Sequence, residues 1–474
     1  MSKAQQISEI IEKIGWGKYN IYLFMIIALT CMLIYYGTAL GSITAKEAAK
    51  DWGMSKFAMS QLGTAQLGGL FIGSFIWGYI ANHYGRIMVL RLCLIISIIT
   101  FLAYTFSVDY YMAISIIFFQ GFGFAGMLST APPTYYECCP PRKAWTMVLV
   151  SWSLCFGLIL GYFVAFITVI AGDSGIGRWR WVSGVGCVLS ILALIGSRWL
   201  LESPRYLDLK GQGAKARDVL KEIARWNKSY DLPQMETPII TYNSNVQEDE
   251  ELEIEELIKP AEKVEFKELF CIHHIKKSIA LAAIGFFGDI GYFGLIEFMP
   301  FFLNNIPNKI TDDASVYGII ILQFSIGSLG ILLSSKLVDT RLGRKWTIII
   351  SYLSCGVFVF LFFIANSYWM ILVSTILIYF FNYIAFSAFF LIVPENYPTN
   401  IRALGQAWVN AASKFGGVLS PFTLGFLIEA PHGVLIGIFV IALSFGVIGI
   451  FGLLVKETRG RGMDAVSLSD TIKD

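Results

Sequence analysis

The sequence has little charge. Only 15% of its 474 residues are Asp, Glu, Lys or Arg, while 56% are hydrophobic; soluble domains average about 25% charged residues. The formal net charge is +2, which provides no strongly basic face for a nucleic acid. This composition excludes a soluble globular protein and argues against a nucleic-acid binder.

Disulfide frameworks and catalytic groups are also missing. The eight cysteines fall in apolar segments or in loops that we assign below to the cytosol, so none can crosslink an outer loop. We find no carboxylate pair suited to a cleft, no metal-ligand spacing and no nucleophile beside a base. The N-terminus shows neither a signal peptide nor a transit pattern. We therefore expect a protein that is not an enzyme and holds no metal or cofactor.

What the sequence does contain is long apolar segments. A helix needs about 20 residues to cross a bilayer core. Twelve segments reach this length: 19–42, 60–81, 87–107, 111–133, 145–171, 180–200, 277–303, 316–338, 346–365, 368–394, 405–429 and 433–455. They predict an all-α membrane protein with twelve transmembrane helices in two six-helix bundles.

A polar linker separates the two sets of six segments. Residues 201–276 contain the acidic run "EDEELEIEELIKPAEKVEFKEL", which is typical of a solvated helix or loop. The expected domains are an N-terminal segment (1–18), a first bundle (19–200), the linker (201–276), a second bundle (277–455) and a tail (456–474). We expect residues 211–262 to be dispensable for the fold, because they contribute no spanning segment.

The basic residues of the short loops predict the orientation. Twelve lysines and arginines lie in the loops and tail on one side, against six on the other. Because cytosolic loops carry the excess of basic residues, both termini and the linker are expected in the cytosol.

A signal repeats at the same place in both halves. "GYIANHYGRIM" (78–88) follows the second segment, and "SKLVDTRLGRKW" (335–346) follows the eighth. Each places Gly-Arg in a tight turn, where glycine supplies backbone freedom and arginine lies at the headgroups. Such a duplication indicates two bundles that rock against each other.

Three further motifs end helices at matching places: "LLESPRYL" (200–207), "PENYPTNIRALG" (394–405) and "KETRGR" (456–461). With them, the sequence resembles the major facilitator superfamily, specifically its sugar-porter, organic-ion and synaptic-vesicle-glycoprotein branches. The resemblance covers nearly everything outside roughly 211–262. It implies a secondary transporter that works by alternating access.

The resemblance also implies a cytosolic charge network that acts as a gate. Its pairs would tie the two halves together in the outward-facing state and break in the inward-facing state. The matching residues are Arg86, Glu137, Arg142, Glu202, Arg205, Asp339, Arg344, Glu395, Arg402 and Glu457. The alternative is that these are ordinary solvated charges, each pair contributing about 0–1 kcal/mol.

The loop motifs depart from the family pattern. Asn82 and His83 stand where the first motif usually has an acid and a base, and one extra residue separates Asp339 from Gly343. Both changes weaken the expected locking contacts. They leave open a second function, that of a transporter-like structural subunit or receptor in a membrane assembly, although a monomer is the simpler expectation.

Ionisable residues are almost absent from the membrane depth. The first six segments have none at mid-depth, and the second six have Asp289, Glu297 and Lys414. At 1.5 Å per residue, Asp289 lies about 18 Å and Lys414 about 15 Å from the cytosolic side, whereas Glu297 lies about 30 Å along, near the outer surface and in contact with water. Intramembrane charges indicate functional sites.

We therefore place a solute site at Lys414. The stretch "SKFGGVLSP" (413–421) resembles that of organic-anion members of the family, so the predicted solute is a small organic anion. Asp289 is its nearest counterpart, and the alternative is a purely structural Lys414–Asp289 pair. Further hydrogen bonds are expected from Asn382, Tyr383, Gln323, Gln120 and Tyr36. The lack of an acid in the first half favours a facilitator or exchanger over a proton symporter.

Overall fold

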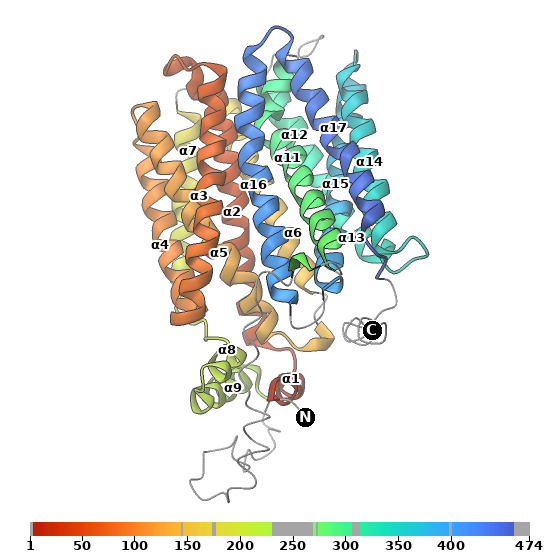
Figure 1. The fold of residues 1–474 in the computed structure, drawn as a ribbon. Helices are drawn as coiled ribbons and strands as arrows, with labels where there is room; N and C mark the ends of the chain where they lie inside the picture. The colour runs from red at the N-terminus through yellow and green to blue at the C-terminus, as the bar shows by residue number, and fades with distance from the viewer. Residues whose placement is uncertain are drawn as a thin grey trace, which may run out of the picture.

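The computed structural model describes residues 3–143, 146–172, 177–229, 269–271, 274–305, 313–397 and 401–458. These residues form helices and no strand (Figure 1). The helices are α1 (Lys3–Ile14), α2 (Lys18–Asp51), α3 (Lys56–Tyr84), α4 (Arg86–Thr105), α5 (Tyr110–Cys138), η1 (Pro141–Lys143), α6 (Thr146–Ile170), α7 (Arg178–Ser197), α8 (Pro204–Leu209), α9 (Gly213–Asn227), α11 (Ile275–Asn305), α12 (Asp313–Gly327), α13 (Leu329–Leu337), α14 (Gly343–Phe363), α15 (Tyr368–Glu395), α16 (Arg402–Glu429) and α17 (Gly433–Leu454).

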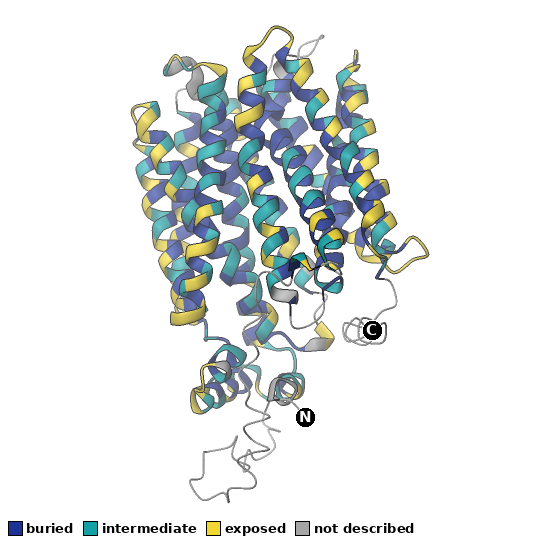
Figure 2. Cartoon of the chain, in the orientation of Figure 1, coloured by how far each residue is buried: buried dark blue, intermediate teal, exposed yellow. Residues whose placement is uncertain are grey.

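The long helices form two bundles, α2–α7 and α11–α17, that stand side by side (Figure 1). Helices α12 and α13 together make one crossing, so each bundle has six. Buried residues line the interior, and large apolar side chains such as Phe75, Ile99 and Phe439 are exposed on the outside (Figure 2). Such extensive apolar exposure fits contact with lipid. The predicted all-α membrane fold is confirmed.

Helix α3 is the least obvious spanning helix. Eleven described spans are long and apolar enough to cross a membrane on composition alone, and α3 is not among them. Its polar and glycine residues serve packing: Gly69 lies against the backbone of Phe118 on α5, and Gly121 of α5 lies against the backbone of Gln66. Small residues let membrane helices approach closely in this way. The glycines of "GFGFAG" (121–126) therefore pack helices, as their place in an apolar segment predicts.

Three short helices, α1, α8 and α9, cluster at one end of the bundles (Figure 1). We call this the linker end and the opposite end the far end. Helix α9 buries Leu220 and Ile223, and its Asn227 side chain accepts a hydrogen bond from the Tyr19 backbone N–H at 2.9 Å. We expected residues 211–262 to be dispensable because the segment is largely polar. Helix α9, however, lies within this range and packs an apolar face against the rest of the protein. The acidic run, 248–269, lies outside the described residues except for its last residue, Leu269.

Candidate functional site

An ion pair lies at the middle of the second bundle. Lys414 Nζ on α16 is 3.0 Å from Asp289 Oδ2 on α11, and the side chains are 21% and 5% exposed. The ammonium group also lies 5.5 Å from the centre of the Phe293 ring. The two charges predicted at similar depth are thus brought together. A lysine held this way has lost much of its water and keeps one carboxylate partner.

Glycines explain why the two helices come so close. Gly416 of α16 lies against the backbone of Phe286 on α11, and a Cβ added at Gly417 would lie 3.0 Å from the Phe293 ring. The small residues of "SKFGGVLSP" therefore let α16 approach α11 until Lys414 reaches Asp289.

The other predicted solute residues are buried, and several lack partners. Gln323 on α12 has neither amide atom hydrogen-bonded within the described chain, and the Asn382 side-chain nitrogen on α15 also has no partner there. Gln120 on α5 accepts a hydrogen bond from Gln66 at 3.2 Å, but its own NH₂ group finds none among the described residues. Since unpartnered buried amides are costly, these groups are suited to a polar ligand.

The two predicted tyrosines differ in their surroundings. The Tyr383 hydroxyl is 3.4 Å from that of Tyr292 on α11. Tyr36, however, donates to the Val182 carbonyl of α7 at 2.6 Å and is fully buried within the first bundle. Its neighbour Tyr35 is the one whose ring lies 6.4 Å from Tyr292, across the bundle interface. Sequence spacing alone does not separate two adjacent tyrosines, because their faces depend on how the helix is rotated.

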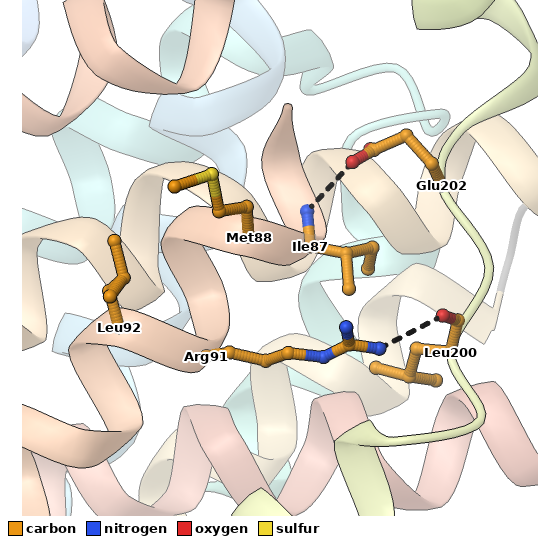
Figure 3. Close-up of a pocket in the computed structure, with 6 residues that line it drawn as sticks. All are labelled: Ile87, Met88, Arg91, Leu92, Leu200 and Glu202. Atoms are coloured by element: carbon orange, nitrogen blue, oxygen red, sulfur yellow. Dashed lines mark hydrogen bonds between the residues drawn. The ribbon is translucent and has the colours of Figure 1, made fainter. Parts of the chain in front are cut away.

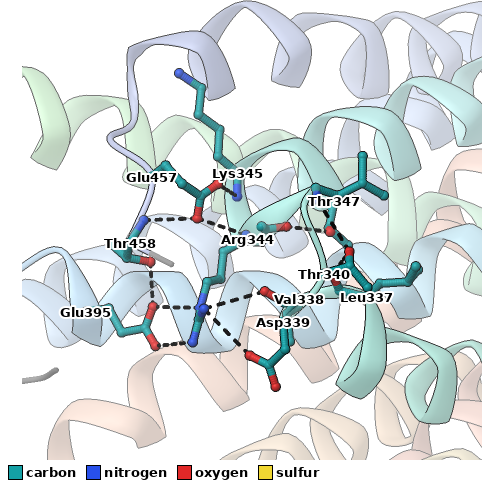
Figure 4. A network of polar contacts seen from close by, with 12 residues as sticks. Leu337, Val338, Asp339, Thr340, Arg344, Lys345, Thr347, Glu395, Glu457 and Thr458 are labelled. Carbon is teal, nitrogen blue, oxygen red and sulfur yellow. Dashed lines mark hydrogen bonds and ion pairs between the residues drawn. The ribbon is translucent and has the colours of Figure 1, made fainter. Parts of the chain in front are cut away.

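At the linker end, the second bundle contains a charge network centred on Arg344. Arg344 Nε lies 3.0 Å from Glu395 Oε2 of α15, and Asp339 is farther away at 3.7 Å (Figure 4). The Glu457 carboxylate accepts the backbone N–H groups of Arg344 and Lys345, both at 3.0 Å. Negative charge at the first turn stabilises α14.

The first bundle repeats this arrangement. Arg86 lies 2.8 Å from Glu137 of α5, and Glu202 accepts the Ile87 backbone N–H at 3.1 Å. Gly85 and Gly343, the turn glycines of the two motifs, have φ values of 108° and 69°. Positive φ requires glycine here, and the carboxylates of Glu202 and Glu457 would meet any added Cβ. The duplicated Gly-Arg signal therefore marks the same structure twice.

Two further predicted gate residues, Arg205 and Arg142, have no described ion pair that joins the two bundles. Arg205 donates to the Ser8 hydroxyl at 3.1 Å, and Arg142, 88% exposed, lies 2.9 Å from Glu12 of α1. The side chain of Arg402 lies outside what the structure describes. The described ion pairs at the linker end thus join elements of one bundle or its peripheral helices.

A hollow also opens at this end of the first bundle. It has a volume of about 360 Å³ and lies between the start of α4 and the chain after α7, with Arg91 and Glu202 in its wall (Figure 3). Arg91 donates to the Ser197 carbonyl at 2.9 Å, and Glu202 already accepts from Ile87. The polar groups in the wall of the hollow therefore already have partners. The hollow lies at the linker end of the first bundle, whereas Lys414 belongs to the second bundle.

The far end carries charges that do join the bundles. Arg178 of α7 lies 3.0 Å from Glu47 of α2 and 2.6 Å from Asp313 of α12. Lys46 is 2.9 Å from Asp313, and the Tyr317 hydroxyl donates to Glu47 at 2.6 Å. We call these five residues the far-end lock. None of these five residues was predicted as a site residue, although opposite charges at three helix ends, in "AKEAAK", "RWRW" and "DDAS", indicated that ion pairs could form there.

Glu297 corrects a sequence expectation. We expected it to be in contact with water near the surface, but only 8% of the residue is exposed. Depth along α11 was a poor guide because the first bundle covers this face: a Cβ added at Gly63 of α3 would lie 2.9 Å from the Glu297 carboxyl carbon.

Comparison with known proteins decides the family. The model of the family described as "Sugar (and other) transporter" matches residues 17–468. The chain belongs to this family of transporters. Among its relatives is the organic cation/carnitine transporter 7 of Arabidopsis thaliana, which is 27% identical over 98% of this chain and 97% of the relative. A niacin transporter, NiaP, from Acinetobacter baylyi is 23% identical over 97% of this chain and 99% of that protein.

Solved structures agree on the fold of this sugar transporter family member. The Escherichia coli xylose transporter XylE, in an inward open conformation, superposes with a TM-score of 0.71 at 17% identity, covering 94% of this chain and 99% of that one. Its partially occluded form gives a TM-score of 0.70 at 16% identity, over 92% and 98%. The chain is thus a multi-pass membrane transporter of the major facilitator fold and not an enzyme.

Proposed function

We propose that this transporter moves a small organic anion by alternating access, as a facilitator or exchanger. The observation that carries the proposal is the buried Lys414–Asp289 pair, 3.0 Å apart on the α11–α16 contact. A partly dehydrated ammonium gains most from an anion that replaces its lost water. An entering carboxylate can compete with Asp289 for Lys414, so the pair opens when solute binds.

Other buried groups support a polar, partly aromatic solute. Phe293 flanks the ammonium, and the buried amides of Gln323, Asn382 and Gln120, on helices α12, α15 and α5, have free hydrogen-bonding capacity within the described chain. Among the relatives, the niacin transporter is named for a pyridine carboxylic acid. Another relative is named for organic cations and carnitine, and the family includes sugar transporters, so binding assays must separate these classes.

The gate residues support one conformational assignment within the proposal. The far-end lock joins the bundles, while the described linker-end pairs, such as Arg86–Glu137 and Arg344–Glu395, stay within one bundle. If the linker end is cytosolic, as the basic loops predict, this is an inward-facing arrangement. The linker-end carboxylates and arginines would then exchange partners between bundles in the outward-facing state.

The test compares ligand-dependent thermal stabilisation of purified protein in four variants. Nicotinate and other monocarboxylates, quaternary ammonium compounds and sugars serve as probes. We expect carboxylates to stabilise the wild type, Lys414→Ala to abolish this effect, and Asp289→Ala to retain or strengthen it. The double variant should behave like Lys414→Ala. Lys336→Ala, at an exposed lysine of α13, is the matched control and should bind like the wild type.

Two results would contradict the proposal: carboxylate binding that survives Lys414→Ala, or stabilisation by cations or sugars in place of anions. The second candidate, a structural subunit or receptor, is kept open by Asn82 and His83. Both are exposed, and His83 Nδ1 lies 2.9 Å from the Tyr79 carbonyl oxygen of its own helix. Purification in a stoichiometric complex without any solute response would favour that role.

A further inference from the structure

Glu297 is a buried acid on the surface between the two bundles. It belongs to α11 of the second bundle, yet its carboxyl packs against Gly63 of α3 and lies near Gly41 of α2, both in the first. The Ser42 hydroxyl of α2 donates to the Ile296 and Glu297 carbonyls at 3.2 and 3.1 Å, so the backbone is held there as well. Opening the far end would necessarily uncover this side chain.

No positive charge offsets the carboxyl in the described structure. Its Oε1 atom is buried without a hydrogen-bond partner, and none of the described ion pairs includes it. The buried hydroxyl groups of Tyr104 on α4 and Tyr162 on α6 also lack hydrogen-bond partners among the described residues. The charged groups of the elements around it have other partners: Lys46 binds Asp313, Glu47 binds Arg178, Lys56 lies over Phe301, and Glu429 accepts from the Phe57 N–H.

The surroundings of Glu297 favour the protonated, neutral form of its carboxyl group over the ionised form. An ionised carboxylate buried without a partner is strongly disfavoured, whereas the neutral acid fits an apolar, glycine-lined contact. When the bundles separate at the far end, Gly41 and Gly63 withdraw, water reaches the group and the cost disappears. Closure therefore favours the protonated form, and opening permits the ionised form.

We propose that Glu297 is a proton-binding site that controls the far end: the bundles close there with Glu297 protonated, and loss of this proton favours opening. Because the far-end compartment is the one uncovered by opening, the proton enters and leaves from that side. The proton then regulates access and need not cross the membrane, which is compatible with a facilitator or exchanger. The inference rests on the alternating-access part of the proposed function and not on the solute.

The direction follows from linkage. The closed state binds one proton more than the open state, so closure is fully favoured at low pH and weakens as pH rises. For a single proton, the closed-to-open ratio falls by up to about tenfold per pH unit over the range in which only the closed state is protonated.

The experiment measures the distance between spin labels at Lys56 of α3 and Leu435 of α17, two exposed far-end positions in different bundles. Solute-free protein, with the exposed Cys271 replaced by serine, is titrated from about pH 5 to about pH 9. We expect the wild type to open progressively as pH rises, and Glu297→Gln to stay closed throughout. Asp109→Asn, the same carboxyl-to-amide change at an exposed far-end residue that accepts the Met112 N–H of its own helix α5, should titrate like the wild type.

A flat wild-type titration, or a Glu297→Gln variant that opens with pH like the wild type, would overturn the inference. Glu297→Met provides a second neutral side chain of similar length if the glutamine variant does not fold, and the same flat, closed result is expected. Since no solute is present, these outcomes are independent of which solute is carried. Failure of the Lys414 experiment would therefore leave this test unaffected, and the converse also holds.

Discussion

The two ends of the molecule use the same residue types in opposite ways. At the far end, Arg178 of the first bundle contacts Asp313 of the second. At the linker end, Arg86 and Arg344 each contact a glutamate of their own bundle. The difference shows that charged residues at an end of the molecule do not by themselves close it. An end is held closed where the ion-pair partner of an arginine belongs to the other bundle.

Burial does not separate the two ends. The side chains of Arg178 and Asp313 at the far end are 10% and 33% exposed, and those of Arg344 and Glu395 at the linker end are 15% and 12% exposed. Removing one partner of such a pair leaves the other charge unpaired and short of water. Because only the far-end pairs cross between the bundles, their loss should change the conformation as well as the stability.

The largest effect is expected from Arg178→Ala. It leaves Glu47 and Asp313 as neighbouring acids without their shared cation, a loss of about 3–5 kcal/mol from the closed arrangement. The Lys56–Leu435 label distance should lengthen, and labels at Tyr84 and Leu342 of the linker end should move together. Arg180→Ala is the control, since Arg180 bonds to Ser107 and stacks on Trp179 in its own bundle. Unchanged far-end distances would show that the lock does not hold the end closed.

A smaller effect, of another kind, is expected from Arg344→Ala. It removes charged hydrogen bonds within the second bundle and should lower the free energy of unfolding by about 1–3 kcal/mol. Because the pair does not cross the interface, both label distances should stay as in the wild type. Thermal unfolding and the two distances are measured on the same samples, and a far-end change would disprove the within-bundle assignment.

A subtler shift is expected from Arg402→Glu. The charge-network hypothesis predicts that reversal removes a contact of the outward-facing state and favours the inward-facing one, by about 0–1 kcal/mol for an exposed pair. The wild type already has its far end closed, so the change is best measured in the Arg178→Ala background. There the reversal should shorten the Lys56–Leu435 distance again. If it lengthens that distance further, Arg402 has no such role.

The least effect is expected from deleting 236–260. This range carries much of the acidic run, lies between the packed helix α9 and α11, and provides no spanning segment. Membrane insertion, thermal stability and both label distances should match those of the wild type. Deleting 213–229 is the informative contrast, because Asn227 and Trp226 contact Tyr19 at the start of α2. Loss of insertion after deletion of 236–260 would show that the acidic run is integral to the protein.

Several features of the fold could be predicted from the sequence because their physics is local. Apolar segments of membrane length predict the spanning helices, and the two Gly-Arg turns predict the repeat, since a turn of that shape needs positive φ at Gly85 and Gly343. Even Lys414 and Asp289 could be matched, because two charges at equal depth on helices of one bundle have few other partners.

Only the tertiary structure decided which face of each helix contacts which neighbour and how the two bundles contact each other. The sequence alone indicated Glu297 as exposed to water and Tyr36 as a solute contact, whereas the structure buries the first and turns the second toward α7. Hydropathy reports how deep a residue lies along its helix and says nothing about which neighbour covers it. That is set by the rotation of each helix and by the rigid-body contact of two bundles, which depend on side chains far apart in the chain.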